Sequence, residues 1–305
     1  MMKLGLVSAI LADFTFEQLI DFAAETKLEC VEVACWPVGK AIRRYAGVTH
    51  IDVCNLTPEK AAYYVDYARS RGIEISALAY YPNTMDADPE LRRLYIEHLY
   101  RLIDAAKLME VNRVTTFIGR DTTRTPEENI ELMLELWPPI VKYAYERGVQ
   151  IAIENCPMYY TGDEWPNGTN LANCPYIWNI MFHSIPYSNF GLNYDPSHML
   201  LQGADYIRPL YDFKDRIFHV HLKDIKMNPE GLYQYGMFNY PSKFHSPKLV
   251  GLGDIDWGKF ISALHDIRYN GYVCIEVEDK AFESCTEDIM KSVVISRNYI
   301  ANYMG

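Results

Sequence analysis

QIAIEN, residues 150–155, is a short run rich in β-branched residues that ends at an acidic side chain, Glu154. Three later segments place a metal-binding residue type where their own apolar run stops: FGLNYDPSH (190–198) has Asp195, IFHVHLKD (217–224) has His221, and YVCIEVED (272–279) has Glu276. These residues are far apart in sequence, but the carboxyl ends of all strands of a parallel barrel meet at one face. Such a barrel would gather the four side chains into a site for one divalent cation.

Eight strand-like runs are spread along the whole chain, at residues 3–8, 30–35, 74–80, 113–119, 150–155, 190–195, 217–223 and 272–278. Segments with helical periodicity lie between them, at about 57–71, 89–109, 125–147, 170–184, 205–215, 257–269 and 284–303. Helix signals support two of these segments, which begin with a Thr-Pro pair, and Gly148 stands where a C-terminal cap is expected. The alternation predicts a parallel α/β fold.

Closure into a barrel is favoured over an open sheet. Eight alternations match the (β/α)8 TIM barrel, which commonly fills a chain of this length, and no low-complexity linker divides residues 1–305. The alternative is a doubly wound sheet, whose phosphate fingerprint would follow the first strand, but residues 5–13 contain no GxGxxG. The sequence therefore predicts one TIM-barrel domain.

Three connections after strand ends are longer than plain turns, at about 36–56, 156–169 and 224–256. In a barrel they would lie on the catalytic face. The second contains Trp165, whose ring suits stacking on the apolar face of a sugar, although a loop that packs on itself is the alternative. The third contains His245 among several aromatic residues, and it is either a lid or an ordinary surface insertion.

The composition bears on partners and compartment. A formal net charge of −11 opposes binding to nucleic acid, which depends on Lys and Arg. The first residues lack the pattern of a signal peptide, and no apolar stretch has the length of a membrane span. The seven cysteines are scattered without a CxxC pair, as is typical of reduced thiols. We expect a cytoplasmic protein without a membrane or nucleic-acid partner.

Each candidate ligand also has a structural interpretation. Strand alternation places Glu154 opposite the isoleucines of its run, and a carboxylate inside a barrel is costly to bury unless a cation compensates it. Asp195 could instead cap the short helix that follows it. His221 is nearer its strand end than His219, which shares its face, so His221 is the candidate ligand and His219 a supporting group; a buried, hydrogen-bonded histidine is the alternative.

Together, the segments IAIEN, NYDPSH, HVHLKD, GLGDIDW and YVCIEVED resemble the xylose isomerase-like barrel superfamily of sugar isomerases and epimerases, which includes inosose dehydratases and endonuclease IV. The resemblance spans most of the chain and is strongest from residue 150 onward. It implies metal ligands at Glu154, Asp195, His221 and Glu276, and it is the main reason for choosing Glu276 over Glu278, which shares its strand face.

The resemblance also implies contacts with a substrate. His198 matches a histidine that touches the substrate or a second metal, and Glu32 matches a polar strand-end position that often faces the substrate; a simple surface carboxylate is the alternative for Glu32. Lys223 is a candidate for binding hydroxyl groups or polarising a carbonyl, unless it forms a structural ion pair with Asp224.

The chemistry follows from such a site. A divalent ion on a carbonyl and its neighbouring hydroxyl stabilises the enediolate formed when the proton between them is removed. In the resembling epimerases two ligand glutamates stand on opposite faces of the substrate, which by analogy assigns proton transfer to Glu154 and Glu276. Oxygen ligands with a single nitrogen favour Mn²⁺, Mg²⁺ or Co²⁺, with Zn²⁺ as an alternative.

Some family features are absent. The Glu and Arg that grip the sugar in tagatose-type ketose 3-epimerases are Tyr160 and Met227 here, and the extra histidines of endonuclease IV are missing. The leading expectation is an isomerase or epimerase acting on a ketose or related polyol ketone, a small and unphosphorylated sugar. The alternatives are a lyase or dehydratase acting on an inosose or keto-glycoside, and a non-catalytic barrel. Barrels of this group often form homo-oligomers, but the sequence reveals no surface for one.

Overall fold

A computed structural model describes residues 1–39, 45–158, 168–237 and 242–304 of the chain. Eight parallel strands form a closed barrel in the order β1-β10-β7-β6-β5-β4-β3-β2, with β2 pairing to β1. The strands are β1 (Lys3–Val7), β2 (Cys30–Ala34), β3 (Glu74–Ala79), β4 (Arg113–Thr116), β5 (Gln150–Glu154), β6 (Phe190–Tyr194), β7 (Ile217–Leu222) and β10 (Tyr272–Ile275). The predicted TIM barrel in a single domain is confirmed, and its eight strands lie within the eight predicted runs.

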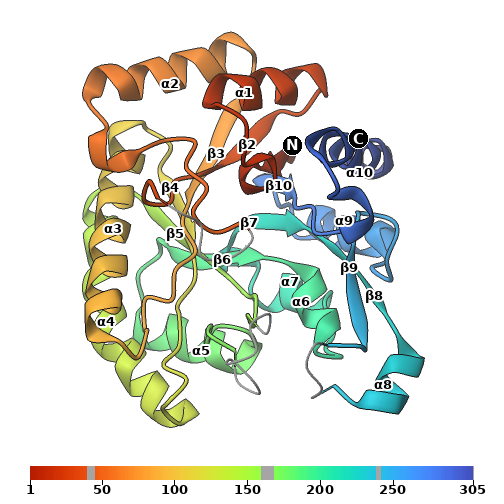
Figure 1. Ribbon diagram of the computed structural model, residues 1–305. Helices are drawn as coiled ribbons and strands as arrows, with labels where there is room; N and C mark the ends of the chain where they lie inside the picture. The colour runs from red at the N-terminus through yellow and green to blue at the C-terminus, as the bar shows by residue number, and fades with distance from the viewer. Residues whose placement is uncertain (40–44, 159–167, 238–241, 305) are drawn as a thin grey trace.

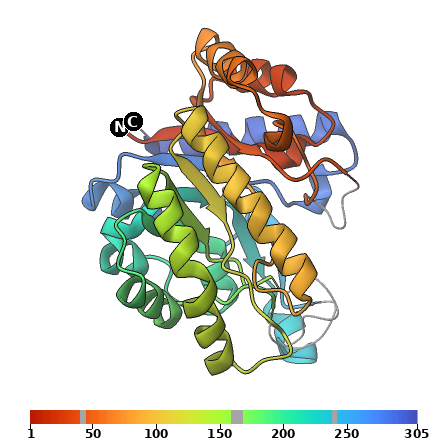
Figure 2. The same ribbon diagram turned by 90° about the vertical axis from the view of Figure 1, so that its left-hand side faces the viewer.

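The helices lie outside the ring of barrel strands, most of them against its surface and α8 on a projecting arm (Figures 1 and 2). They are α1 (Phe16–Glu25), α2 (Pro58–Ser70), α3 (Pro89–Leu108), α4 (Pro126–Glu146), α5 (Pro175–Ser184), α6 (Pro196–Leu201), α7 (Arg208–Asp212), α8 (Pro229–Tyr235), α9 (Trp257–Asp266) and α10 (Thr286–Met304). Short 3₁₀ turns cover Ser8–Leu11, Val53–Asn55, Lys214–Arg216 and Lys280–Phe282. No described helix combines the length and the apolar character that a membrane span requires.

Three helices, α1, α6 and α8, were not among the predicted helical segments, although a short helix after Asp195 was part of one interpretation of that residue. The start of α1 carries a capping box, in which the Thr15 side chain accepts a hydrogen bond from the Gln18 backbone and the Gln18 side chain accepts one from Thr15 N–H. This reciprocal pair satisfies two backbone donors that the first turn of a helix leaves open. The Thr-x-x-Gln spacing was therefore a usable sequence signal for α1.

Strand alternation separates two environments in the barrel. Side chains such as Ile151 and Ile153 are fully buried in the main hydrophobic core. The neighbouring positions on β5, Ala152 and Glu154, alternate with them and therefore point into the barrel. The inner side chains near the carboxyl ends of the strands are unusually polar, as His221 of β7 illustrates. This polar interior supplies the candidate site.

The third long connection forms an arm that projects from the barrel (Figure 1). Its strands β8 (Asp224–Met227) and β9 (His245–Lys248) pair antiparallel, and α8 follows β8. The fully buried Asp224 carboxylate anchors the base of the arm by accepting hydrogen bonds from Gly251 N at 2.9 Å, Ile255 N at 3.1 Å and Trp257 Nε1 at 2.7 Å. Gly253 passes so close that an added Cβ would lie 2.2 Å from Asp224 Oδ1.

Candidate metal centre

The four predicted ligands meet at the carboxyl face of the barrel. Glu154 ends β5, Asp195 directly follows β6, His221 lies in β7, and Glu276 directly follows β10. One ligand atom from each residue lies within 4.8 Å of the others. His221 Nδ1 is 3.5 Å from Glu154 Oε1 and 3.5 Å from Glu276 Oε2. Three of the four side chains are buried, and that of Glu276 is 16% exposed.

The donor atoms of this cluster fit a divalent cation. Within the described part of the chain, no hydrogen-bond partner is present for the buried atoms Asp195 Oδ2 and His221 Nδ1. Buried polar atoms normally have hydrogen-bond partners, whereas Asp195 Oδ2 has ion pairs with His198 Nε2 and Lys223 Nζ at 3.3 Å each, and both atoms could bind a cation. Three carboxylates and one imidazole are ligands that Mn²⁺, Mg²⁺, Co²⁺ and Zn²⁺ accept. The cluster is therefore consistent with a divalent metal site whose ion is not identified.

The environment keeps the two glutamates ionised. Burial alone would raise the pKa of Glu154, but the neighbouring His198 and His221 rings, 3.3 and 3.5 Å from Oε1, outweigh burial and hold that pKa well below its usual range. Burial likewise opposes ionisation of Glu276, yet the charge of Lys223 and the neighbouring His221 ring lower its pKa to about 2. Both side chains are thus carboxylates at neutral pH, as metal ligands and proton acceptors must be.

Lys223 belongs to this cluster. Its Nζ lies 2.9 Å from Glu276 Oε2, 3.3 Å from Asp195 Oδ2 and 3.5 Å from Glu278 Oε2. The Asp224 carboxylate, the partner in the alternative interpretation, accepts the hydrogen bonds at the base of the arm. Lys223 therefore supplies a positive charge directly beside the candidate ligands.

His198 of α6 completes the inner rim. Its Nε2 lies 3.3 Å from both Glu154 Oε1 and Asp195 Oδ2. Cys156 was not predicted, but with Glu154 and His198 it forms a second group whose ligand atoms lie within 4.8 Å of one another. The available sequence signal was its position two residues after Glu154, just past the end of β5.

The arm brings His245 toward the same region. Burial, with a smaller contribution from the charge of His198, lowers the pKa of His245 to about 4, so its ring is neutral at pH 7. Its Nδ1 is a buried atom without a hydrogen-bond partner among the described residues. Trp165, predicted to stack on a sugar, lies outside the described residues.

Behind His221 lies a polar network that joins Glu32 and His219, both singled out from the sequence, to Tyr81 and Asn193, which were not; Glu32 is not a surface carboxylate. Glu32 is fully buried in β2, and its Oε2 is 2.8 Å from His221 Nε2. The Tyr81 hydroxyl donates to Glu32 Oε1 at 2.7 Å, and Asn193 contacts both Tyr81 and His221 at 3.0 Å. Burial holds the pKa of His219 well below its usual range, so this neighbour of Asn193 is neutral. Glu32 therefore lies on the side of His221 that faces away from the ligand carboxylates.

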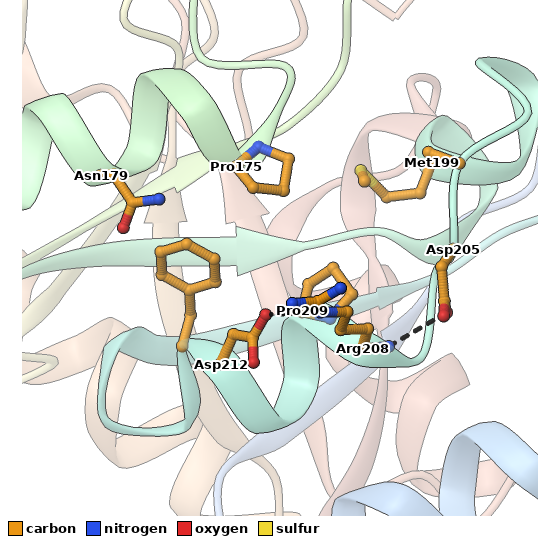
Figure 3. A pocket seen from close by; sticks show the side chains of 9 residues that line it. Pro175, Asn179, Met199, Asp205, Arg208, Pro209 and Asp212 are labelled. Carbon is orange, nitrogen blue, oxygen red and sulfur yellow. Dashed lines mark hydrogen bonds and ion pairs between the residues drawn. The ribbon is translucent and has the colours of Figure 1, made fainter.

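A separate pocket of about 540 Å³ lies outside the barrel between α5, α6 and α7 (Figure 3). Met199 lines this pocket, whereas His198, its neighbour on α6, reaches the ligand cluster. Arg208 in the pocket pairs with Asp212 at 3.0 Å, and both side chains are largely exposed. The pocket lining lacks the convergent buried ligand types that the barrel face carries.

Comparisons of sequence agree with this architecture. A family model described as "Xylose isomerase-like TIM barrel" matches residues 20–293. The chain is 25% identical over 305 residues to the uncharacterized protein YfiH of Bacillus subtilis (strain 168), covering 91% of this chain and 93% of that protein. It is 28% identical over 184 residues to an inosose dehydratase of Clostridium tetani (strain Massachusetts / E88), covering 60% of this chain and 59% of that enzyme.

Solved structures share the fold. An IolI protein with a bound zinc atom superposes with a TM-score of 0.73 at 17% identity, covering 100% of both chains. A D-psicose 3-epimerase of Clostridium cellulolyticum H10, solved with D-tagatose, superposes with a TM-score of 0.70 at 15% identity, covering 99% of each chain. At these identities the likeness concerns the fold alone.

Proposed function

The chain belongs to the xylose isomerase-like TIM barrel family, and from that premise we propose that it is a divalent-metal-dependent sugar isomerase or epimerase. Its substrate is a ketose or related polyol ketone, and the reaction passes through an enediolate. The observation that carries the proposal is the cluster of Glu154, Asp195, His221 and Glu276, with both glutamates ionised beside Lys223. The D-psicose 3-epimerase with the same fold supports the substrate class.

The proposed mechanism assigns a task to each side chain. A bound Mn²⁺, Mg²⁺ or Co²⁺, with Zn²⁺ as the alternative, would polarise the substrate carbonyl and its neighbouring hydroxyl. Glu154 removes the proton from the carbon beside the carbonyl, and Glu276 returns a proton from the other side. His198 and Lys223, which contact the ligand carboxylates, bind substrate hydroxyls. His245 lines the arm side of the site as a neutral hydrogen-bonding group.

A second candidate is dehydration of an inosose, or cleavage of a keto-glycoside, by the same proton removal. The match to an inosose dehydratase favours it, as does the presence of Tyr160 and Met227 where tagatose-type epimerases carry sugar-gripping residues. In this reaction the electron pair left by proton removal expels a hydroxyl or a glycosidic oxygen from the next carbon, and the leaving oxygen takes up a proton, so that one proton is removed and one is added and water or an alcohol departs. The product mass therefore separates the two candidates.

The proposal includes a location and a partner class. All seven cysteines are free thiols, which supports a reducing compartment such as the cytoplasm. The partner is a small sugar, and the acidic net charge of −11 argues against nucleic acid.

The test is proton exchange in D₂O. Protein stripped of metal and resupplied with Mg²⁺ is incubated with ketoses, inososes and 3-keto-glycosides, and the loss of α-proton signals is followed by NMR. We expect metal-dependent exchange with one substrate class. Glu154→Gln and Glu276→Gln should each slow the exchange by roughly 10²–10⁴-fold, because each removes a proton-transfer group.

The control is Glu135→Gln, the same change at an exposed position of α4, which should exchange at the wild-type rate. Full turnover in either site variant would contradict the assigned roles. Metal binding without exchange on any substrate would favour the non-catalytic barrel.

A further inference from the structure

We infer that Glu32 is a positioning residue that holds the proton of His221 on Nε2 and so leaves Nδ1 ready to bind the cation. The inference rests on the proposed function, because it assumes that Glu154, Asp195, His221 and Glu276 bind a divalent ion. It places Glu32 behind the metal site, where it acts through His221 and does not contact the substrate.

The two edges of the His221 ring face different carboxylates. Nε2 is 2.8 Å from Glu32 Oε2, whereas Nδ1 faces Glu154 and Glu276 at 3.5 Å each. A neutral imidazole carries one proton on its two nitrogens, and only the unprotonated nitrogen can bind a metal. With the proton on Nε2 and donated to Glu32, the lone pair of Nδ1 points at the carboxylates that would share the ion.

Asn193 competes for the same edge of the ring. Its Nδ2 is 3.0 Å from His221 Nε2, and it would donate a hydrogen bond there only if the ring carried its proton on Nδ1. Hydrogen bonds to a carboxylate are stronger than those between neutral groups, and the contact from Glu32 is also shorter. Asn193 Nδ2 has a separate acceptor in the Tyr81 hydroxyl at 3.0 Å. Glu32 therefore decides which nitrogen is protonated.

The surroundings fix the Glu32 carboxylate in this orientation. Its side chain has no solvent exposure, and Oε1 accepts a hydrogen bond from Tyr81 at 2.7 Å. Asn193 is itself oriented by His219, whose Nδ1 donates to Asn193 Oδ1 at 3.0 Å and whose Nε2 lies 3.1 Å from Ser76 Oγ. Partners that orient a metal-bound histidine typically contribute 10–100-fold to metal affinity.

The first measurement is calorimetric titration of metal-free protein with Mg²⁺ and with Zn²⁺. Glu32→Gln keeps the size of the side chain but removes its charge, and it should raise the Kd roughly 10–100-fold. The matched control is Glu278→Gln, which removes the same charge from a carboxylate that lies on Lys223, 3.5 Å away, and not on the ring. For this control we expect the Kd to rise by well under tenfold. Equal increases of the Kd in the two variants would mean that only the loss of a negative charge matters, and would overturn the inference.

The second measurement uses NMR to determine which nitrogen of the His221 ring carries the proton. In ¹⁵N-labelled wild-type protein loaded with Mg²⁺, His221 should show a proton on Nε2 that is shifted far downfield by the carboxylate, and Glu32→Gln should move it upfield. A proton on Nδ1, or an Nε2 proton at the position typical of a neutral partner, would overturn the inference even if the variant failed to fold. Absence of cation binding by the wild-type protein would instead overturn the proposed function.

Discussion

Lys223 places an ammonium group where the candidate ligands converge. It contacts Glu276 and Asp195 at 2.9 and 3.3 Å, and its side chain is only 5% exposed. In the metal-free protein it balances part of the negative charge of the cluster, and a divalent cation would meet it as a neighbouring like charge. One residue thus stabilises the empty site and weakens the affinity of that site for metal.

Replacing Lys223 with Met should separate these two effects. Metal-free Lys223→Met should lose about 3–5 kcal/mol of unfolding free energy, because buried carboxylates lose their partner. Added Mg²⁺ should then stabilise the variant more than it stabilises the wild type, which urea unfolding with and without Mg²⁺ would measure.

Lys142→Met is the control, because Lys142 forms an exposed pair with Glu146 at 3.8 Å and should contribute less than about 1 kcal/mol. Equal stabilisation of wild type and Lys223→Met by Mg²⁺ would contradict the proposed repulsion.

At the residue scale, the sequence predicts which ligand candidates lie at the ends of strands. Glu154, Asp195 and His221 follow apolar runs, and a parallel barrel necessarily brings such ends together. The partner of His221 could not be predicted, because the contact with Glu32 joins residues 189 positions apart across the barrel interior. Such a contact depends on strand register and on side-chain rotamers, which a single sequence does not specify.

At the scale of elements, the arm depends on one carboxylate. Asp224 accepts hydrogen bonds from three backbone amides and the Trp257 indole, and all of these donors except the Ile225 amide come after the arm has returned to the barrel. Removing the carboxylate would leave these buried donors without an acceptor. The arm also carries His245, so its anchor affects the rim of the site.

Asp224→Ala should lower the free energy of unfolding by about 2–4 kcal/mol, because several charged hydrogen bonds are lost together. Hydrogen exchange should accelerate first in β8 and β9, which pair with each other and not with the barrel. Asp212→Ala, at a half-exposed ion pair on α7, should change stability by less than about 1 kcal/mol. Uniform exchange across barrel and arm would argue against a local anchor.

The sequence pattern predicts some helices and strands and not others. The barrel strands were predicted because each is a compact apolar run. The pair of β8 and β9 was missed because β9 reads HSPK, which contains a proline and little apolar character. Helix α1 was not predicted, although Thr15 and Gln18 have the spacing of a capping box.

At the scale of the whole molecule, cation binding should stabilise the fold. A ligand at one hundred times its Kd contributes about 2.7 kcal/mol to the native state. For a chain of 305 residues this raises the Tm by about 4 °C. Thermal melts with added Mn²⁺ and then with excess chelator would measure the effect, and chelator should remove it. A Tm indifferent to every divalent ion would count against the metal site.

Because the sheet is closed, the metal affinity of the site depends on strands that carry none of the four ligands. All four ligands come from the adjacent strands β10-β7-β6-β5 or the residues that directly follow them, whereas Glu32 comes from β2 on the other side. Metal affinity therefore reports on barrel closure as well as on ligand identity. A substitution that loosens the pairing of β2 with β1 or β3 would move Glu32 away from His221. The affinity for the cation would then fall because the His221 proton is no longer held on Nε2, although all four ligands are still present.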